Sequence, residues 1–400
     1  MLKRISSKDL RVGMHLHQLC GPYLDHPFWR TKFTIEDQET IKLILASNIK
    51  EVVIDVAKGD DVEKPSPVAP EPPPSHAPSQ EPVSIEQEMA QASQICAKAK
   101  EAVQSMFHEV RMGKALDASD AMPLVEEISS SVMRNPGALI SLARLKTKDD
   151  YTYMHSVAVC GLMVALAKHM ELDAESTRLA GMAGLLHDVG KMAIPPEILD
   201  KPGKLTDEEF SVIKRHPSEG FTMLQGSGGV ADIVLDVVHH HHEKVDGSGY
   251  PDKLHGEQIS LYAKMGAVCD VYDAITSNRP YKDGWGPAES LHKMAEWSKG
   301  HFDEHIFNAF VKSIGIYPIG SLVRLKSGKI GVVIDQSGSL LAPIVKTFYS
   351  VKTKERITPG IINLETTHNP DNIVAIEDPA KWKFHDLNEL WSGLHHPPAV

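Results

Sequence analysis

An adjacent histidine and aspartate, His187 and Asp188, begin a series of residues whose types are suited to binding metal ions. The imidazole offers a nitrogen, whereas the carboxylate has two oxygens and can therefore bridge two ions. Further candidate ligands follow at His216, in the run His241-His242-Glu243, and at Asp270. A mixed nitrogen and oxygen site of this kind leaves positions open for water, so the series indicates metal-assisted chemistry.

Any one of these histidines is equally well explained as an ordinary surface or core residue, but the whole set would require several coincidences of spacing. His155 lies upstream and is available to the same centre. We expect one metal ion to be surrounded by His155, His187, Asp188 and Asp270. We expect Asp188 to bridge to a second ion held by His216, His241 and His242. His239 and His240 extend the histidine run and fit packing or solvated positions better.

A pair of metal ions about 3.5–4 Å apart acidifies water and neutralises a phosphate oxygen. The sequence contains no recognisable serine or cysteine nucleophile with its base, so activated water is the natural nucleophile. Lys191, one turn past Asp188, can stabilise charge that develops on a phosphate. Arg279 and Lys282 can grip phosphates, although each alone is also explained as a solvated surface charge. Tyr250 follows a glycine-rich turn and can stack on a base or hydrogen-bond the substrate.

The elements that must position these residues are helices. From about residue 120 to 315 the pattern is helix after helix with short polar turns. A helix that runs through Leu186 delivers His187 and Asp188 at its end. A second helix, which begins with a capping box at Thr206 and Glu209, delivers His216. Helix ends that meet at one centre would hold several ligands rigidly.

The rest of the chain divides by composition. Residues 1–60 indicate a small α+β domain, in which Thr34 caps a helix from about Ile35 to Ala46. The helix that starts at the capping box of Ser84 and Gln87 either packs on the main domain or forms a dimer stalk. The predicted divisions are 1–60, a Pro-rich linker at 61–84, a connecting helix at 85–118, the catalytic domain at 119–315, a small β appendage at 316–375 and a polar tail at 376–400. The fold class is therefore mainly α.

Composition excludes several classes of function. With 42% apolar residues in 400, the chain can bury a sizeable core. The net charge of −11 argues against a broad surface for polymeric nucleic acid or for anionic membranes. The four cysteines have no paired spacing and indicate reduced thiols. The first residues form no apolar signal region, and no apolar run is long enough for a membrane span, so we expect a cytoplasmic protein.

The motifs resemble the HD-GYP subgroup of the HD-domain phosphohydrolases, a bacterial signal-transduction family. The matching segments occur in the right order: His187-Asp188-Val189-Gly190-Lys191, His241-His242-Glu243, Asp246-Gly247-Ser248-Gly249-Tyr250-Pro251, Asp270-Val271-Tyr272-Asp273-Ala274 and Arg279-Pro280-Tyr281-Lys282. The resemblance covers about residues 120–315 and is specific, because several separated motifs are present. Residues 1–60 also resemble the small N-terminal domain of unknown function that is often fused to this subgroup.

The resemblance implies an HD-type helical bundle with a non-haem centre of two or three divalent metal ions, most often iron or manganese, with nickel or others as further options. It implies hydrolysis of cyclic di-GMP to linear pGpG and on to GMP. The implied metal ligands are His155, His187, Asp188, His216, His241, His242 and Asp270. Lys191, Tyr250, Arg279 and Lys282 fall at substrate-contacting positions, Asp188 and Lys191 are the implied catalytic pair, and Asp273 lies behind the ligands.

One departure and several alternatives remain. Trinuclear members carry a Glu one helical turn before the first histidine, where this chain has Tyr151, so we expect two ions. The substrate could instead be cyclic GMP-AMP, or the domain could bind a cyclic dinucleotide with weak or no turnover. A nucleotidase of the HD type is disfavoured by the Gly-Tyr-Pro loop and by Arg279 and Lys282. A homodimer and a signalling partner that contacts residues 1–60 are further options.

Overall fold

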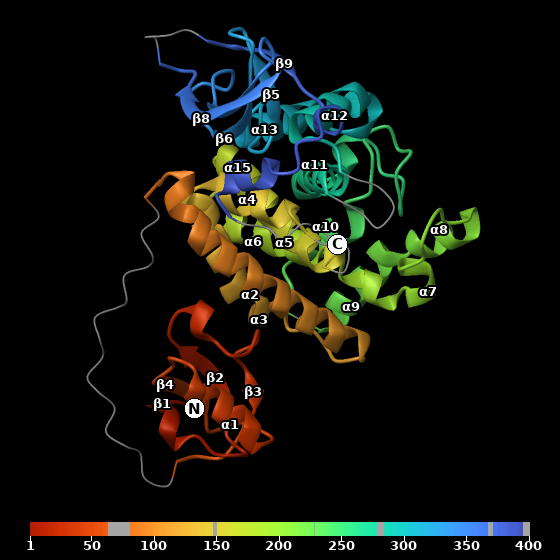
Figure 1. The fold of residues 1–400 in the computed structure, drawn as a ribbon. Helices are drawn as coiled ribbons and strands as arrows, with labels where there is room; N and C mark the ends of the chain where they lie inside the picture. Colours follow the sequence, from red (N-terminus) through yellow and green to blue (C-terminus); the bar gives the residue numbers. More distant parts are fainter. Residues whose placement is uncertain (63–80, 147–149, 228, 278–283, 367–370, 395–400) are drawn as a thin grey trace.

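The computed structural model describes residues 1–62, 81–146, 150–227, 229–277, 284–366 and 371–394. A small sheet lies at one end of the molecule, a bundle of helices in the middle, and a second sheet at the opposite end (Figure 1). The predicted fold class, mainly α with a small α+β domain and a small β appendage, is confirmed. No helix in the described ranges has both the length and the hydropathy needed to cross a bilayer.

The first sheet is antiparallel, with strand order β1-β4-β2-β3. Its elements are β1 (Leu2–Ser6), η1 (Ser7–Asp9), β2 (His15–Cys20), η2 (Tyr23–Asp25), β3 (Phe33–Thr34), α1 (Gln38–Ala46) and β4 (Glu51–Asp55). Helix α1 begins later than predicted, because Asp37 rather than Thr34 accepts the capping hydrogen bond, from the N–H of Thr40 at 2.8 Å. Thr34 instead pairs with His15 in the sheet.

The loop between β2 and β3 joins the first domain to the helices. Tyr23 and Trp29 are buried and pack with the core of the bundle, not with the core beneath the first sheet. Lys98 donates hydrogen bonds to the carbonyl oxygens of Leu24, at 3.3 Å, and of His26. The first domain and the helical bundle therefore touch directly, in addition to the predicted linker that joins them in the sequence. Most of that predicted linker, residues 63–80, lies outside the described residues.

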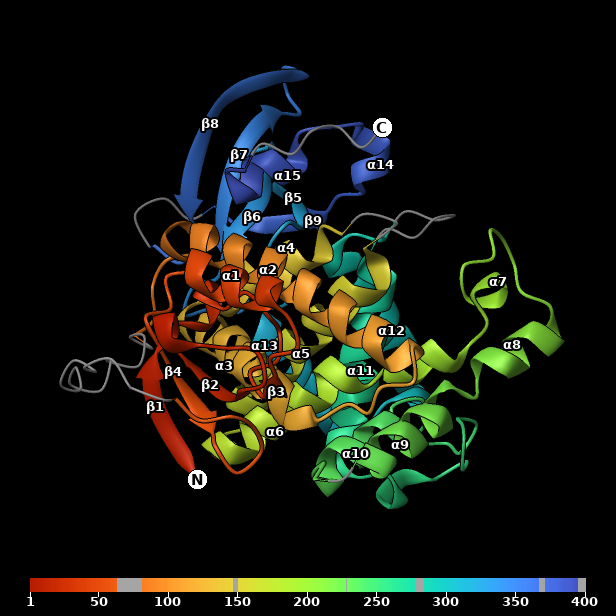
Figure 2. The same cartoon turned by 90° about the horizontal axis from the view of Figure 1, so that it is seen from below.

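The bundle is built around one helix, α5, that is apolar on every side. All its residues from Met154 to Ala167 are buried, which is typical of a helix enclosed by others. The bundle comprises α2 (Ile85–Arg111), α3 (Ala118–Arg134), α4 (Pro136–Arg144), α5 (Tyr151–His169), α6 (Ala174–Leu186), η3 (Val189–Ala193), α7 (Pro196–Leu199), α8 (Asp207–Ile213), α9 (His216–Ser227), α10 (Asp232–His240), η4 (Gly256–Gln258), α11 (Leu261–Thr276), α12 (Pro287–His301) and α13 (Glu304–Ile314). Helices α7 and α8 project away from it (Figure 2).

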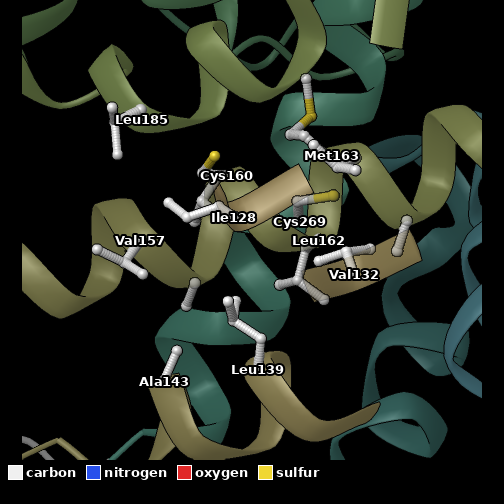
Figure 3. Packing of buried hydrophobic residues seen from close by; sticks show 14 of the residues in the cluster. Ile128, Val132, Leu139, Ala143, Val157, Cys160, Leu162, Met163, Leu185 and Cys269 are labelled. Atoms are coloured by element: carbon white, nitrogen blue, oxygen red, sulfur yellow. The ribbon is translucent and has the colours of Figure 1, made fainter. Parts of the chain in front are cut away.

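Close packing around α5 determines where the neighbouring helices end in space. Figure 3 shows Val157, Cys160, Leu162 and Met163 of α5 among Ile128 and Val132 of α3, Leu139 and Ala143 of α4, Leu185 of α6 and Cys269 of α11. Gly184 allows α6 to approach closely, because a Cβ there would lie 2.8 Å from the carbonyl oxygen of Val159. This approach brings the end of α6, and the residues that follow it, beside α5.

Helix α2 packs on the bundle, which favours the first of the two interpretations drawn from its sequence. Its capping box forms as predicted between Ser84 and Gln87. Its buried face joins the core of the bundle. Within that interface, the carboxylate of Glu88 accepts hydrogen bonds from Arg134 at 2.6 and 2.7 Å and from Ser131 at 2.7 Å.

The second sheet has strand order β8-β7-β6-β5-β9, with antiparallel neighbours throughout. Its strands are β5 (Leu322–Leu325), β6 (Lys329–Asp335), β7 (Ile344–Ser350), β8 (Glu355–Asn363) and β9 (Ile373–Ile376), followed by α14 (Pro379–Trp382) and α15 (Leu387–Ser392). The segment predicted as a polar tail thus contains two short helices. Trp391 is buried, with the Arg144 guanidinium 6.0 Å from its ring centre, so apolar burial orders this segment.

Candidate metal centre

The predicted ligands converge from five helices or their ends at the centre of the bundle. His155 lies on α5, His187 and Asp188 follow α6, His216 opens α9, His241 and His242 follow α10, and Asp270 lies on α11. Every one except His242 is buried, and 23% of the His242 side chain remains exposed. The structure therefore brings together all seven residues that were expected to hold metal ions.

The first group of donors comprises His155, His187 and Asp188. The Nε2 atoms of His155 and His187 are 3.2 Å apart. Oδ2 of Asp188 lies 3.3 Å from His187 Nε2 and 3.5 Å from His155 Nε2. Oδ1 of Asp270 adds a second carboxylate oxygen, 3.0 Å from His155 Nε2. Two nitrogens and two oxygens thus face one point.

The second group comprises His216, His241 and His242. The Nε2 atoms of His216 and His241 are 3.3 Å apart. The other oxygen of Asp188, Oδ1, lies 3.3 Å from His216 Nε2 and 4.0 Å from His241 Nε2. Oδ2 of Asp270 lies 3.7 Å from Nδ1 of His242. Each oxygen of Asp188 therefore faces a different group, as a bridging carboxylate would.

The hydrogen bonds of the imidazoles test whether this arrangement fits metal ions. Nδ1 of His216 contacts the carbonyl oxygen of Ile213 at 2.8 Å, and Nδ1 of His241 contacts that of Val237 at 3.0 Å. A carbonyl only accepts, so both Nδ1 atoms carry the proton and both Nε2 atoms present lone pairs. Two lone pairs that face each other at 3.3 Å cannot hydrogen-bond, whereas a cation between them satisfies both.

The first group repeats this pattern. His187 donates from Nδ1 to the carbonyl oxygen of Gly184 at 2.8 Å, and His155 donates from Nδ1 to Asp273 at 2.6 Å. When both rings are neutral, their Nε2 lone pairs therefore also face each other. Oδ1 of Asp188 is buried and has no hydrogen-bond donor among the described residues. The donor set, its tautomers and this carboxylate oxygen together fit a pair of divalent cations.

The charges at the centre suit metal binding. Burial alone would raise the pKa of Asp188, but Lys191 and His187 hold it well below its usual range. Burial and then His242 lower the pKa of His241 far below its ordinary value. For His155, burial lowers the pKa, but hydrogen bonds to Asp270 and Asp273 more than offset this and raise it. A metal ion bound by His155 must therefore compete with a proton.

A buried lysine that sequence reasoning missed supports His155 from behind. Lys146 is fully enclosed, and its ammonium lies 2.5 Å from Oδ2 of Asp273, the same oxygen that receives Nδ1–H of His155. A carboxylate behind a ligating histidine fixes its ring orientation and tautomer. Asp273 thus lies behind His155, and Lys146 neutralises its charge. Lys146 belongs to no motif, so only the fold shows its role.

Tyr151 lies against the same histidine. Its ring is nearly parallel to that of His155, with centroids 5.7 Å apart and 9° between the planes. The ammonium of Lys146 lies 5.5 Å from the Tyr151 ring centre. The position that carries a Glu in trinuclear relatives is thus filled here by an aromatic ring and a neighbouring cation.

The Gly-Tyr-Pro loop is held at the edge of the second group. The rings of Tyr250 and His242 lie 4.7 Å apart, and the N–H of Tyr250 donates to the His242 carbonyl at 3.2 Å. The carboxylate of buried Glu243 accepts hydrogen bonds from the N–H groups of Asp252, at 2.7 Å, and Leu254, at 3.1 Å. Glu243 was noted in the motif but was assigned no role; the structure shows that it anchors this loop.

Of the three cationic side chains predicted to contact the substrate, the structure describes only Lys191. Lys191 forms an ion pair with Oδ2 of Asp188, so its ammonium lies directly at the centre. Arg279 and Lys282 fall within residues 278–283, outside the described part of the chain. Burial, and then the nearby charges of Asp270 and Asp188, raise the pKa of Tyr250, so its hydroxyl stays protonated and available as a donor.

A helical bundle with paired histidine and aspartate groups at its centre has the features of the HD-domain class of metal-dependent hydrolases. The family profile described as HD domain matches residues 132–306, and that described as a domain of unknown function (DUF3391) matches residues 2–121. The chain is 53% identical to the "Cyclic di-GMP phosphodiesterase PA4108" of Pseudomonas aeruginosa, over 98% of this chain and 96% of that protein. The chain belongs to the HD-GYP family, in the form that carries this N-terminal domain.

Two more distant relatives each match less than half of this chain. "Cyclic di-GMP phosphodiesterase response regulator RpfG" of Xanthomonas campestris is 48% identical over 38% of this chain and 40% of its own length. "3'3'-cGAMP-specific phosphodiesterase 1" of Vibrio cholerae is 36% identical over 47% of this chain and 42% of its own length. The solved HDG"Y"P protein Bd1817 of Bdellovibrio bacteriovorus aligns with a TM-score of 0.47 at 16% identity, over 78% of this chain and 99% of that chain.

Proposed function

We propose that this protein is a metal-dependent phosphodiesterase that hydrolyses cyclic di-GMP to pGpG in bacterial second-messenger signalling. The observation that carries the proposal is the pair of facing donor groups that share Asp188. Full-length similarity to a cyclic di-GMP phosphodiesterase supports the substrate. A cyclic dinucleotide has two phosphodiesters, and its phosphates are the class of anion that such a cationic centre would bind.

The roles of the chain's own residues follow from their positions. A pair of divalent ions, when bound, would lower the pKa of water and neutralise charge on the phosphate. Asp188 would hold both ions, and Asp270 and the five histidines would complete the two groups. Lys191, which already contacts Asp188, would stabilise the negative charge that builds up as the phosphodiester is cleaved. Tyr250 would donate a hydrogen bond from its hydroxyl or stack on a guanine.

The metal number and type belong to this proposal. We propose two ions at the centre, iron or manganese, because imidazole with carboxylate suits these metals and the centre presents two groups of donors. The cytoplasm is the proposed location. Residues 1–60 are the proposed binding site for a signalling partner. Because Tyr23 and Trp29 pack into the core of the bundle, binding of that partner would be transmitted to the catalytic domain through them. A homodimer stays a prediction.

The choice between two substrates can be tested directly. Anaerobically purified protein should be given cyclic di-GMP and 3'3'-cGAMP separately, with products resolved by chromatography. We expect the larger kcat/KM for cyclic di-GMP, because the relative that spans nearly the whole chain carries that name and the cGAMP-specific one spans less than half of it. A larger kcat/KM for 3'3'-cGAMP would establish the alternative substrate.

Replacing Tyr151 by Glu should raise the metal content from two towards three ions per chain. A hard cation needs an anionic oxygen ligand, and a neutral phenol with a pKa of about 10 is a poor one at pH 7. The ring of Tyr151 lies on His155, so a carboxylate there would adjoin the first group. The second cut, from pGpG to GMP, should also become faster, because a third cation can hold the terminal phosphate.

The matched control is Tyr151→Gln, which has the size of Glu without its charge and should keep two ions. Elemental analysis measures the metal ions per chain in both variants and in the unmodified protein. Three well-occupied Mn²⁺ or Fe²⁺ ions at the candidate metal centre of the unmodified protein would contradict this account of Tyr151.

Arg279→Ala and Lys282→Ala should each weaken substrate binding by roughly 1–3 kcal/mol, the loss expected for a charge-assisted phosphate contact. Metal content should not change, because neither residue belongs to the donor groups. The measurement is KM and kcat with metal counting alongside. Kinetics that are unaltered in both variants would show that the two cations are only solvated surface groups.

A further inference from the structure

A third set of metal-type donors lies outside the candidate metal centre, at the outer end of α10. His239, His240 and Asp252 each place one ring nitrogen or carboxylate oxygen within 4.8 Å of the others. His239 and His240 were expected to be packing or solvated residues. We name these three residues the outer site. None of them belongs to either donor group described above.

His240 is oriented as metal-binding histidines are. Its Nδ1 contacts Oδ1 of Asp236, one helical turn earlier, at 2.8 Å. A carboxylate behind Nδ1 fixes the ring and leaves Nε2 as the binding atom. That Nε2 lies 3.2 Å from Oδ2 of Asp252. Asp236 is itself held, because the hydroxyl of Ser260 donates to its other oxygen.

His239 completes the set from the side of α9. Its ring is sandwiched between two others, with centroids 4.8 Å from Phe221 and 4.6 Å from His240. Its Nε2 is 3.4 Å from the hydroxyl of Ser218, a weak contact at the limit of a hydrogen bond. Stacking therefore fixes the ring, and no carboxylate forms an ion pair with it within the described residues. A second imidazole is thus positioned beside the first.

We propose that the outer site binds one divalent ion of the zinc class, independently of the reaction catalysed at the centre. Two imidazoles and one carboxylate are a recognised ligand set for zinc, with a fourth position left to water. The Asp252 side chain is 51% exposed and that of His240 17%, so the ion would exchange with solvent rather than be enclosed. This exposure distinguishes the outer site from the buried centre.

An ion at the outer site would hold the Gly-Tyr-Pro loop from a second side. Glu243 already binds the N–H of Asp252 from within. The ion would attach the side chain of Asp252, which lies two residues after Tyr250, to His239 and His240 of α10. The loop would then be fixed by both the backbone and the side chain of Asp252, so bound zinc should raise the thermal midpoint of the protein.

The test counts ions on the full chain. Protein loaded with Mn²⁺ is dialysed against Zn²⁺, and both metals are measured per chain for the unmodified protein, His239→Gln, Asp252→Asn and the control His292→Gln. His292 is an exposed histidine on α12, paired with Glu296. We expect the first two variants to bind one ion fewer than the unmodified protein and the control to bind the same number. Asp236→Asn should keep the site but weaken it roughly 10–100-fold.

Thermal midpoints with and without Zn²⁺ provide a second readout, and circular dichroism checks that each variant is folded. The zinc-dependent rise should be smaller in His239→Gln and Asp252→Asn than in His292→Gln. Equal ion counts in all folded proteins would overturn the proposal and show that the three residues form only a hydrogen-bonded surface network. A loss in His292→Gln as large as in the other two would overturn it as well.

Discussion

Replacing Asp188 by Ala should abolish hydrolysis, with a fall in kcat of at least roughly 10³-fold, and should lower the metal content. Each oxygen of Asp188 faces a different donor group, at 3.3 Å from His187 Nε2 and from His216 Nε2. Metal ions supply several kcal/mol of charge stabilisation to such a reaction, and about 1.4 kcal/mol corresponds to a factor of ten in rate. Loss of the shared carboxylate removes a ligand from both ions at once.

The matched control is Asp200→Ala, an exposed aspartate that follows α7. It should keep full activity and full metal content. Elemental analysis and initial rates are measured on the same preparations, so that loss of metal and loss of activity can be compared. Near-normal turnover and full metal in Asp188→Ala would show that the carboxylate does not join the two groups.

Replacing Lys146 by Met should reduce the free energy of unfolding by about 3–5 kcal/mol, the usual cost of removing one partner from a buried ion pair. The Lys146 side chain has no exposed surface, and that of Asp273 has 3%. Without the ammonium, the Asp273 carboxylate stays buried with its charge uncompensated. His155 would also lose its fixed support, so metal affinity should fall.

Lys168→Met is the comparison, because Lys168 is an exposed lysine near the end of the same helix, α5. Its cost should be about 1 kcal/mol or less, because the Lys168 ammonium makes one exposed hydrogen bond, to the Met133 carbonyl oxygen at 3.2 Å. Denaturant unfolding of the two variants measures the difference. Equal stability of Lys146→Met and Lys168→Met would show that the pair with Asp273 contributes nothing measurable.

The residues that converge at the centre could be predicted because the chemistry requires them at recognisable spacings. His187 and Asp188 are adjacent and follow the predicted helix that ends at Leu186. The predicted capping box of Thr206 and Glu209 also forms, but the prediction that its helix delivers His216 was wrong, because α8 ends at Ile213 and His216 opens the next helix, α9. Which nitrogen of each histidine faces inward could not be predicted, since backbone carbonyls of Gly184, Ile213 and Val237 decide it. Assigning these residues as metal ligands stays a proposal.

Other features depend on tertiary contacts that no local pattern contains. Lys146 lies 127 positions from Asp273 in the chain, so its buried pairing follows only from the fold. Thr34 and Asp37 are both good helix caps, and the pairing of β3 with β2 decided between them. Trp391 lies in a segment that was predicted as a polar tail, and one aromatic residue there did not predict a helix. Its burial against the bundle orders α15.

The central claim is that the paired donor groups hold metal ions that drive hydrolysis of a cyclic dinucleotide, and a single reconstitution tests it. Anaerobically purified protein is stripped with a chelator, reloaded with Mn²⁺ or Fe²⁺, and mixed with cyclic di-GMP while metal content and products are followed. We predict that pGpG forms in proportion to metal occupancy and ceases on stripping, with saturation near two ions per chain. Tight binding of cyclic di-GMP without any linear product at full metal occupancy would contradict the account.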